Sequence, residues 1–288
     1  MKKKKAQVFI LLGQSNAVGH QLPMSDKDKI VRPLRNVFGL HRKDNQSFNL
    51  RRLIWNGYVS GGMNLGETQD DMYSLANCLA ALWQQTIDAG VDLPDLYVVQ
   101  IAVGAQGVTE KYMWNPKKEE VLIPGDLKHV RIALFPFTCK VLSLLDESFQ
   151  AIGTDYEVLG LHWRGGEEEM RVPIDELKKK LTPIYDEMFG GFQKSLARPA
   201  PIVLHKLLCE ERTRIDGRTE EWPYSLRYVN QVFEELALHN GNVTVFDTGR
   251  YPGEKLFMVD CVHYTADVNR WVALQILENA VKRLGGTV

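Results

Sequence analysis

A serine and a histidine near opposite ends of the sequence have the surroundings that nucleophilic chemistry requires. Ser15 lies in "GQSN", residues 13–16, directly after an apolar run, and His263 closes the pattern Asp260-x-x-His263. A serine hydroxyl becomes a strong nucleophile when a histidine takes its proton and a carboxylate holds that histidine in the right tautomer. These residues therefore predict acyl transfer, with Ser15 as nucleophile, His263 as base and Asp260 as the orienting group.

Each of these patterns has a simpler interpretation when it occurs alone. A Gly-x-Ser at the end of a strand is typical of a helix N-cap, and an Asp-x-x-His pattern is typical of a capping or surface pair. What favours the chemical interpretation is that both patterns, together with two polar loops, follow strands of one predicted sheet.

Five apolar runs predict strands that are buried on both faces of a parallel sheet. They are continuous and rich in Val, Ile and Leu, and they cover residues 7–12, 96–103, 156–163, 201–208 and 242–247. Segments with helical periodicity alternate with them at 71–90, 127–149, 174–192, 225–241 and 265–286. This alternation predicts a single α/β domain over residues 1–288. Residues 1–5 are expected to form a flexible overhang, and residues 20–70 an irregular excursion near the cleft.

Two loops are expected to meet Ser15 and His263 at one edge of this sheet. Gly104-Ala105-Gln106-Gly107 follows the second strand, and Trp163-Arg164-Gly165-Gly166-Glu167 ends the third. In open parallel sheets the active site lies beyond the carboxyl ends of the strands. Backbone N–H groups at the bend after the first strand suit a developing oxyanion.

The order of these motifs resembles the SGNH hydrolase superfamily and, more narrowly, its sialate O-acetylesterase-like branch, which includes carbohydrate acetylesterases. "GQSN" at 13–16 and "DCVH" at 260–263 match that branch closely, and "VGAQGVTEKYMW" at 103–114 matches its glycine-rich second motif loosely. The resemblance implies a flavodoxin-like three-layer α/β/α sandwich and a serine esterase that removes O-acetyl groups from a carbohydrate. It also implies that the backbone N–H groups of Ser15 and Gly104 hold the oxyanion.

One motif departs from the family pattern Trp-x-Gln-Gly-Glu. Gly165 stands where the family has a glutamine whose amide donates to the oxyanion, and losing one such donor costs on the order of 10²–10³ in rate. Three outcomes are open: Gln106 or Arg164 replaces the donor, the enzyme is slow or acts on a substrate that brings its own hydrogen bond, or the chain is a pseudo-enzyme that binds glycans without cleaving them. Substrate contacts are expected from Gln14, Asn16, Trp114, Arg164 and Glu167.

Composition narrows the partners and the location. A formal net charge of −1 over 288 residues argues against nucleic-acid binding, which needs a basic excess, and no apolar stretch reaches the ~18–20 residues of a membrane span. Four cysteines without a CxxC pair favour a reducing, cytoplasmic location over a disulfide framework or zinc site; export through a leader ahead of this sequence would also fit. The expected partner is an acetylated carbohydrate or other small acyl ester, with no cofactor or metal, and no oligomeric state is predicted.

Overall fold

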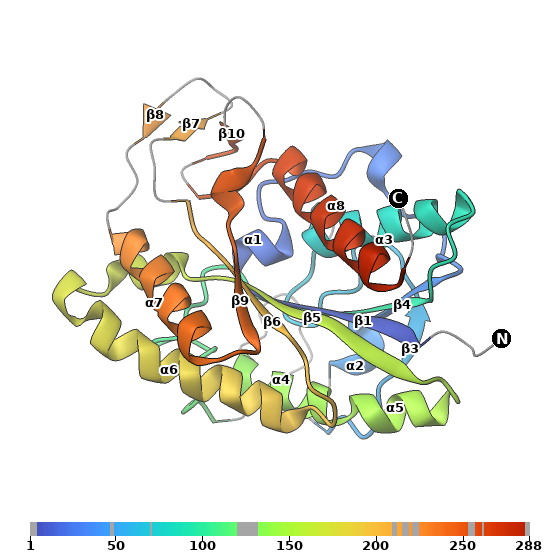
Figure 1. The fold of residues 1–288 in the computed structure, drawn as a ribbon, viewed down its shortest axis with the longest axis horizontal. Helices are drawn as coiled ribbons and strands as arrows, with labels where there is room; N and C mark the ends of the chain where they lie inside the picture. The colour runs from blue at the N-terminus through green and yellow to red at the C-terminus, as the bar shows by residue number, and fades with distance from the viewer. Residues whose placement is uncertain are drawn as a thin grey trace.

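A parallel sheet forms the centre of the computed structural model, which describes residues 5–46, 49–69, 71–119, 132–208, 212–214, 219–220, 225–252, 257–260 and 262–285. In these residues the main sheet has seven strands in the order β3-β2-β4-β1-β5-β6-β9 (Figure 1). They are β1 (Ala6–Gly13), β2 (Val37–Leu40), β3 (Trp55–Gly57), β4 (Leu96–Ala102), β5 (Tyr156–Arg164), β6 (Ile202–His205) and β9 (Val243–Phe246). β3 pairs with β2 in the antiparallel sense, and the other pairings are parallel.

Helices cover both faces of this sheet (Figure 1). α3 (Leu75–Asp88) and α8 (Ala266–Arg283) pack together on one face, and the other face carries α4 (Leu134–Ser143), α5 (Leu145–Ala151), α6 (Ile174–Ser195) and α7 (Ser225–His239). Short elements join them: α1 (Ser15–Val18), η1 (Asp26–Asp28), α2 (Arg42–Asn45), η2 (Glu167–Arg171) and η3 (Thr248–Arg250). A small second sheet has the order β10-β7-β8, with β7 (Arg212–Arg214), β8 (Thr219–Glu220) and β10 (Phe257–Met258).

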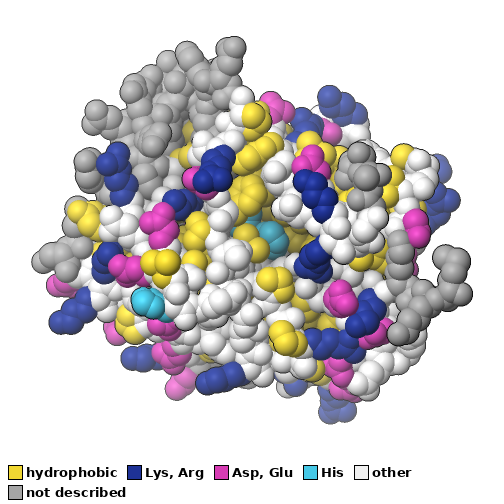
Figure 2. Space-filling view, in the orientation of Figure 1, with side chains coloured by type: hydrophobic (Ala, Val, Ile, Leu, Met, Phe, Trp, Pro, Cys, Tyr) yellow, Lys and Arg dark blue, Asp and Glu magenta, His cyan; other side chains and the backbone are white. Residues whose placement is uncertain are grey.

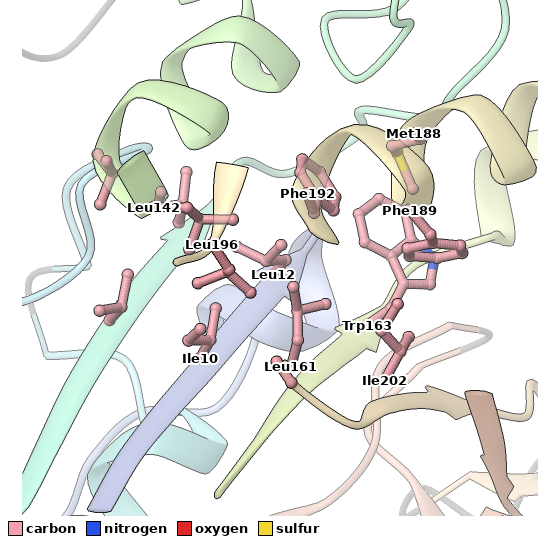
Figure 3. Packing of buried hydrophobic residues seen from close by; sticks show 14 of the residues in the cluster. Ile10, Leu12, Leu142, Leu161, Trp163, Met188, Phe189, Phe192, Leu196 and Ile202 are labelled. Atoms are coloured by element: carbon pink, nitrogen blue, oxygen red, sulfur yellow. The ribbon is translucent and has the colours of Figure 1, made fainter. Parts of the chain in front are cut away.

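Alternate residues of the central strand β1 lie in two separate hydrophobic cores. Ile10 and Leu12 belong to the core beneath α4, α6 and α7, which Figure 3 shows around Trp163 and Phe192. Phe9 and Leu11 belong to the core beneath α3 and α8. Because successive side chains of a strand point to opposite faces, a strand that is apolar throughout must be covered on both sides. The predicted α/β/α sandwich is therefore confirmed.

The prediction of five strands is wrong, because the segment 20–70 is not simply irregular. It contains β2 and β3, and β2 lies parallel to β4 with Val37 opposite Leu96. A strand of four residues interrupted by Gly39 is too short for its apolar pattern to be recognised. The predicted excursion thus contains two strands at one edge of the sheet, followed by a loop that reaches Gly104 after β4.

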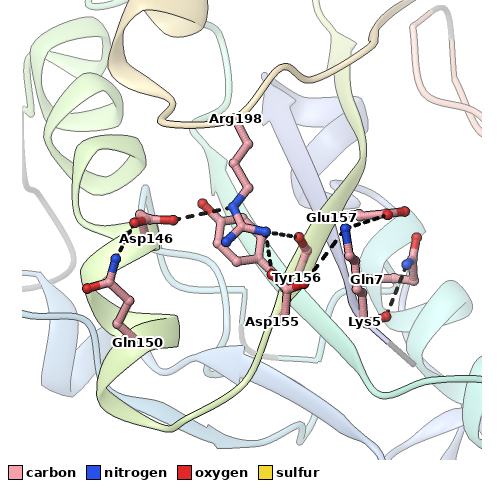
Figure 4. Close-up of polar contacts among 8 residues, drawn as sticks. All are labelled: Lys5, Gln7, Asp146, Gln150, Asp155, Tyr156, Glu157 and Arg198. Carbon is pink, nitrogen blue, oxygen red and sulfur yellow. Dashed lines mark hydrogen bonds and ion pairs between the residues drawn. The ribbon is translucent and has the colours of Figure 1, made fainter. Parts of the chain in front are cut away.

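Exposed ion pairs gather at the amino-terminal ends of the strands, where β5 begins (Figure 4). Arg198 Nη1 lies 2.5 Å from Asp155 Oδ1 and 2.6 Å from the Tyr156 carbonyl. Lys5 Nζ lies 3.3 Å from Glu157 Oε1, so the end of the predicted overhang contacts the domain, while residues 1–4 lie outside the described residues. Exposed pairs of this kind stabilise a fold by about 0–1 kcal/mol each. None of the described helices is both long and apolar enough to cross a membrane.

Candidate active site

The chain turns sharply at the carboxyl end of β1 to present Ser15. Gly13 has a φ of 143°, and a Cβ there would lie 2.0 Å from the Arg164 carbonyl oxygen of the neighbouring strand. Only glycine fits such a close approach. Ser15 then begins α1 and is 7% exposed. Its N–H is one of the first four of a helix and has no partner within that helix.

Asp260 and His263 form a hydrogen-bonded pair within one turn of chain. Asp260 Oδ2 lies 2.7 Å from His263 Nδ1, and Asp260 Oδ1 accepts from the backbone N–H groups of Val262 and His263 at 2.7 and 2.8 Å. Burial acts to raise the pKa of Asp260, but the hydrogen bonds from His263 and the two N–H groups lower it further, so its pKa lies below the usual value. The carboxylate therefore keeps its charge and orients the ring.

Asn16 fastens the histidine loop to the serine turn. Its Nδ2 donates to the Val262 carbonyl at 3.1 Å, and its Oδ1 accepts from the Tyr264 N–H at 3.2 Å. The residues on both sides of His263 are thus bonded to the residue that follows Ser15. No hydrogen bond joins Ser15 Oγ to His263 Nε2 within the described residues, and catalytic hydrogen bonds are often longer in a free enzyme than in the substrate complex.

Glu167 braces the serine turn from the end of β5. It accepts a hydrogen bond from Gln14 Nε2 and one of 2.7 Å from Asn16 Nδ2, and all three side chains are buried. These residues were predicted to contact substrate. In the structure they hydrogen-bond one another and hold Ser15 in place.

Trp114, which was predicted to contact substrate, packs beneath the serine turn. Its ring is fully buried, packs edge-on against Trp163 at a centroid distance of 5.1 Å, and donates its Nε1–H to the Gly13 carbonyl at 3.1 Å. An indole in this position fixes the end of β1 from the buried side of the serine turn. It does not reach the solvent-exposed side of the turn.

Neither side chain predicted to replace the glutamine amide absent at Gly165 makes a hydrogen bond to Ser15 among the described residues. Gln106 Oε1 accepts from the Met113 N–H at 3.0 Å and so braces its own loop. Arg164 is buried under α8, where Nη1 donates to Asn269 Oδ1 at 2.6 Å and the guanidinium lies 5.1 Å from the Tyr264 ring centroid. Burial lowers the pKa of Arg164.

The Gly104 N–H, predicted to hold the oxyanion, donates to Glu67 Oε2 at 3.1 Å. The other oxygen of Glu67 pairs with His20 Nε2, and the His20 ring lies 6.1 Å from the His263 ring. Sequence reasoning missed His20 and Glu67. The "SGGMNLGE" stretch at 60–67 was the available signal, since glycines permit a loop to pack closely against a strand end.

Within the described residues, no three His, Cys, Asp or Glu side chains are grouped so that they could hold a metal ion. The groups at this edge of the sheet are therefore a serine, two histidine–carboxylate pairs and backbone N–H donors. Such a set can perform acyl transfer through the serine oxygen.

Comparison with solved structures identifies the fold. A protein from Arabidopsis thaliana is similar over 97% of this chain and 99% of its own, with 16% identity and a TM-score of 0.58. NanS is similar over 99% of both chains, with 12% identity and a TM-score of 0.60. Est24, a carbohydrate acetylesterase from Sinorhizobium meliloti, is similar over 98% of this chain and 99% of its own, with 11% identity and a TM-score of 0.45. No protein-family model and no curated protein matches the sequence. The chain therefore shares the α/β fold of the first two of these proteins.

Proposed function

We propose that this protein is a serine esterase that removes O-acetyl groups from a carbohydrate. Ser15 Oγ attacks the acetyl carbonyl while His263 Nε2 takes the hydroxyl proton. His263 then gives that proton to the departing sugar oxygen, which leaves an acetyl group on Ser15. Water, deprotonated by His263, attacks this acetyl group, and His263 returns the proton to Ser15 Oγ as acetate is released. Asp260 keeps the proton of His263 on Nδ1, so that Nε2 is free to act as the base.

The observation that supports this proposal most directly is the double hydrogen bond of Asn16 to both neighbours of His263. It holds a carboxylate-oriented imidazole beside a serine turn, although the two lie almost 250 residues apart in sequence, at positions 15 and 263. Core packing does not require a serine and an Asp–His pair to meet at the carboxyl edge of a sheet. A nucleophile and its base must meet there.

Hydrolysis of 4-nitrophenyl acetate by the wild-type protein and by Ser15→Ala tests the proposal. We expect measurable turnover in the wild type and its loss in Ser15→Ala, because the nucleophilic oxygen is gone. Ser143→Ala is the matched control: Ser143 is exposed at the end of α4, and this variant keeps the wild-type rate. Equal rates for wild type and Ser15→Ala would rule out the esterase.

A non-catalytic glycan-binding protein is the second candidate, and one feature favours it. Gly165 has no side-chain amide, and the Gly104 N–H is occupied by the Glu67 carboxylate, so an oxyanion would have to take the place of Glu67 at this donor. The loss of one oxyanion donor slows an esterase by about 10²–10³, whereas it has no effect on sugar binding. Binding of an acetylated xylo-oligosaccharide without Ser15-dependent release of acetate would establish this second function.

A further inference from the structure

A second histidine–carboxylate pair faces His263 across the site. His20 Nε2 pairs with Glu67 Oε1, and the His20 and His263 ring centroids are 6.1 Å apart with planes inclined at 56°. The backbone N–H of His20 donates to the Ser15 carbonyl at 3.0 Å. The turn that follows Ser15 therefore positions the imidazole. The side chains of His20 and Glu67 are 28% and 25% exposed. A substrate can therefore reach them.

Glu67 is fixed to the end of β4 by a set of backbone contacts. Its Oε2 accepts from the Gly104 N–H at 3.1 Å, and its carbonyl accepts from Asn64 Nδ2 at 3.1 Å. Asn64 is itself buried and bonded to both backbone groups of Ala102, at 2.8 and 2.9 Å. A Cβ on Gly66 would lie 2.2 Å from the Ala102 carbonyl oxygen, so the loop packs tightly there. Glu67 is thus a preorganised group that holds His20 in one orientation.

The two imidazoles are oriented in opposite senses. A carboxylate that accepts from one ring nitrogen keeps the proton on that nitrogen and leaves a lone pair on the other. Asp260 faces Nδ1 of His263, which leaves Nε2 for Ser15, whereas Glu67 faces Nε2 of His20, which leaves Nδ1. Nδ1 of His20 has no hydrogen-bond partner in the part of the chain that the structure describes. The proposed mechanism uses one of these two acceptors and leaves the other.

We propose that His20 determines specificity by contacting the substrate: its Nδ1 accepts a hydrogen bond from a hydroxyl on the carbon next to the esterified one. The site would then favour acetyl esters of vicinal diols, the arrangement found in sugars, over simple esters. The proposal rests on the esterase function proposed above. It is supported by the place of the ring, since a Cβ on Gly104 would lie 2.2 Å from His20 Cε1. The imidazole therefore packs against Gly104, whose N–H would hold the acyl oxygen after the oxygen has displaced Glu67 Oε2.

Two esters that differ by one hydroxyl test this proposal: trans-2-hydroxycyclohexyl acetate and cyclohexyl acetate. For the wild type we expect kcat/KM to be about tenfold higher for the hydroxyl-bearing ester, which is the size of one good neutral hydrogen bond. In His20→Phe this preference falls to about one, because the ring no longer carries an acceptor. His20→Gln, whose side-chain oxygen accepts hydrogen bonds, retains part of it.

The ratio of the two rates on one preparation does not depend on how much of that preparation is folded. His239→Phe, at the exposed end of α7, is the control that keeps the full preference. A wild type without preference, or a His20→Phe variant that keeps it while both rates fall together, would overturn the proposal. Failure of the esterase function looks different: neither ester is then hydrolysed in a Ser15-dependent way, and the proposal falls with it.

Discussion

Histidines of this protein form polar pairs in two regions that differ in what surrounds them. At the carboxyl edge of the sheet, His263 is 14% exposed on its side chain and bonded to the Asp260 carboxylate at 2.7 Å. Within the sheet, His162 Nδ1 and His205 Nε2 lie 2.9 Å apart, and both rings are buried on the neighbouring strands β5 and β6. One pair joins an imidazole to a negative charge, whereas the other joins it to a second imidazole.

The difference decides which pair can do chemistry near neutral pH. Burial, with a smaller contribution from Arg164, lowers the pKa of His162 to about 3, and burial lowers that of His205 well below its usual value. Neither ring can take up a proton at neutral pH, so neither can serve as a base. His162 does line a cavity of about 290 Å³ beside α8, and Figure 2 shows a hollow on that face. His162 lines a cavity, but without a carboxylate partner to stabilise its charged form it cannot act as a base.

Asp260→Asn tests whether the carboxylate sets the edge pair apart, and it should have the largest effect. An asparagine keeps the size of the side chain but allows the wrong histidine tautomer, so we expect kcat for 4-nitrophenyl acetate to fall by about 10³–10⁴. The fold should persist, since Asp260 is only partly buried. Steady-state kinetics, combined with a thermal unfolding midpoint for each protein, checks both statements.

The control for this variant is Asp155→Asn. Asp155 lies at the amino-terminal end of β5, far from the carboxyl ends of the strands, and forms an exposed ion pair with Arg198. It should keep the wild-type kcat. If Asp260→Asn retained more than a tenth of the wild-type rate, the Asp260 carboxylate would not be an orienting group. The contrast between the two histidine regions would then need another explanation.

Much of this architecture could be predicted because it follows from local patterns. β1, β4 and β5 are largely apolar runs, and the helix from 75 to 88 has a regular period and is followed by Gly90. The pairing of Asp260 with His263 follows from a spacing of three residues. In each case the chemistry or the packing is decided by neighbours in sequence, which periodicity and spacing record.

What could not be predicted depends on contacts between distant segments. His20 and Glu67 are separated by 47 positions and have no periodic pattern that links them. Gln106 and Arg164 have suitable side chains for the missing donor, but their direction depends on Met113 and Asn269. β2 and β3 are too short to be recognised, and β2 joins the sheet by pairing with the distant strand β4. Each of these features depends on tertiary contacts, which the residue types alone do not determine.

Replacing the core pair by His162→Leu together with His205→Leu should change stability with pH and leave the edge pair intact. In the wild type the unfolded chain binds protons below a pKa of about 6.5, whereas folded His162 binds one only near pH 3. Stability is therefore present above pH 6.5 and lost as the pH falls, by about 3 kcal/mol at pH 4 from His162 alone. The double variant should lose less stability on acidification. Urea unfolding between pH 4 and pH 7 measures this.

His239→Leu serves as the control for that experiment, because His239 is exposed at the end of α7. It should show the pH dependence of the wild type. If the double variant showed the same loss towards pH 4 as the wild type, the two core histidines would not be held neutral by burial.

Two carboxyl groups differ in the same way as the histidine pairs: the pKa of Asp260 at the site is lowered, whereas that of the buried Glu169 is raised. Glu169→Gln tests this difference, and its expected effect is smaller. Glu169 is buried, and its Oε1 accepts from the Val108 N–H at 2.6 Å. Burial raises its pKa to about 7 against the lowering effect of that hydrogen bond, and the nearby charge of Glu167 adds to the rise. A carboxyl with a raised folded pKa stabilises the fold below the unfolded pKa of about 4.5, and this stability is lost as the pH rises through 7.

For the wild type this loss amounts to about 3 kcal/mol by pH 8. A glutamine keeps an oxygen for the Val108 N–H and carries no charge, so Glu169→Gln should have a free energy of unfolding that changes little between pH 5 and pH 8. Glu110→Gln, in an exposed position of the loop after β4, should follow the wild type. Parallel curves for wild type and Glu169→Gln would mean that Glu169 is ionised in the folded protein, and that the core of this domain accepts a charge which the present contacts do not neutralise.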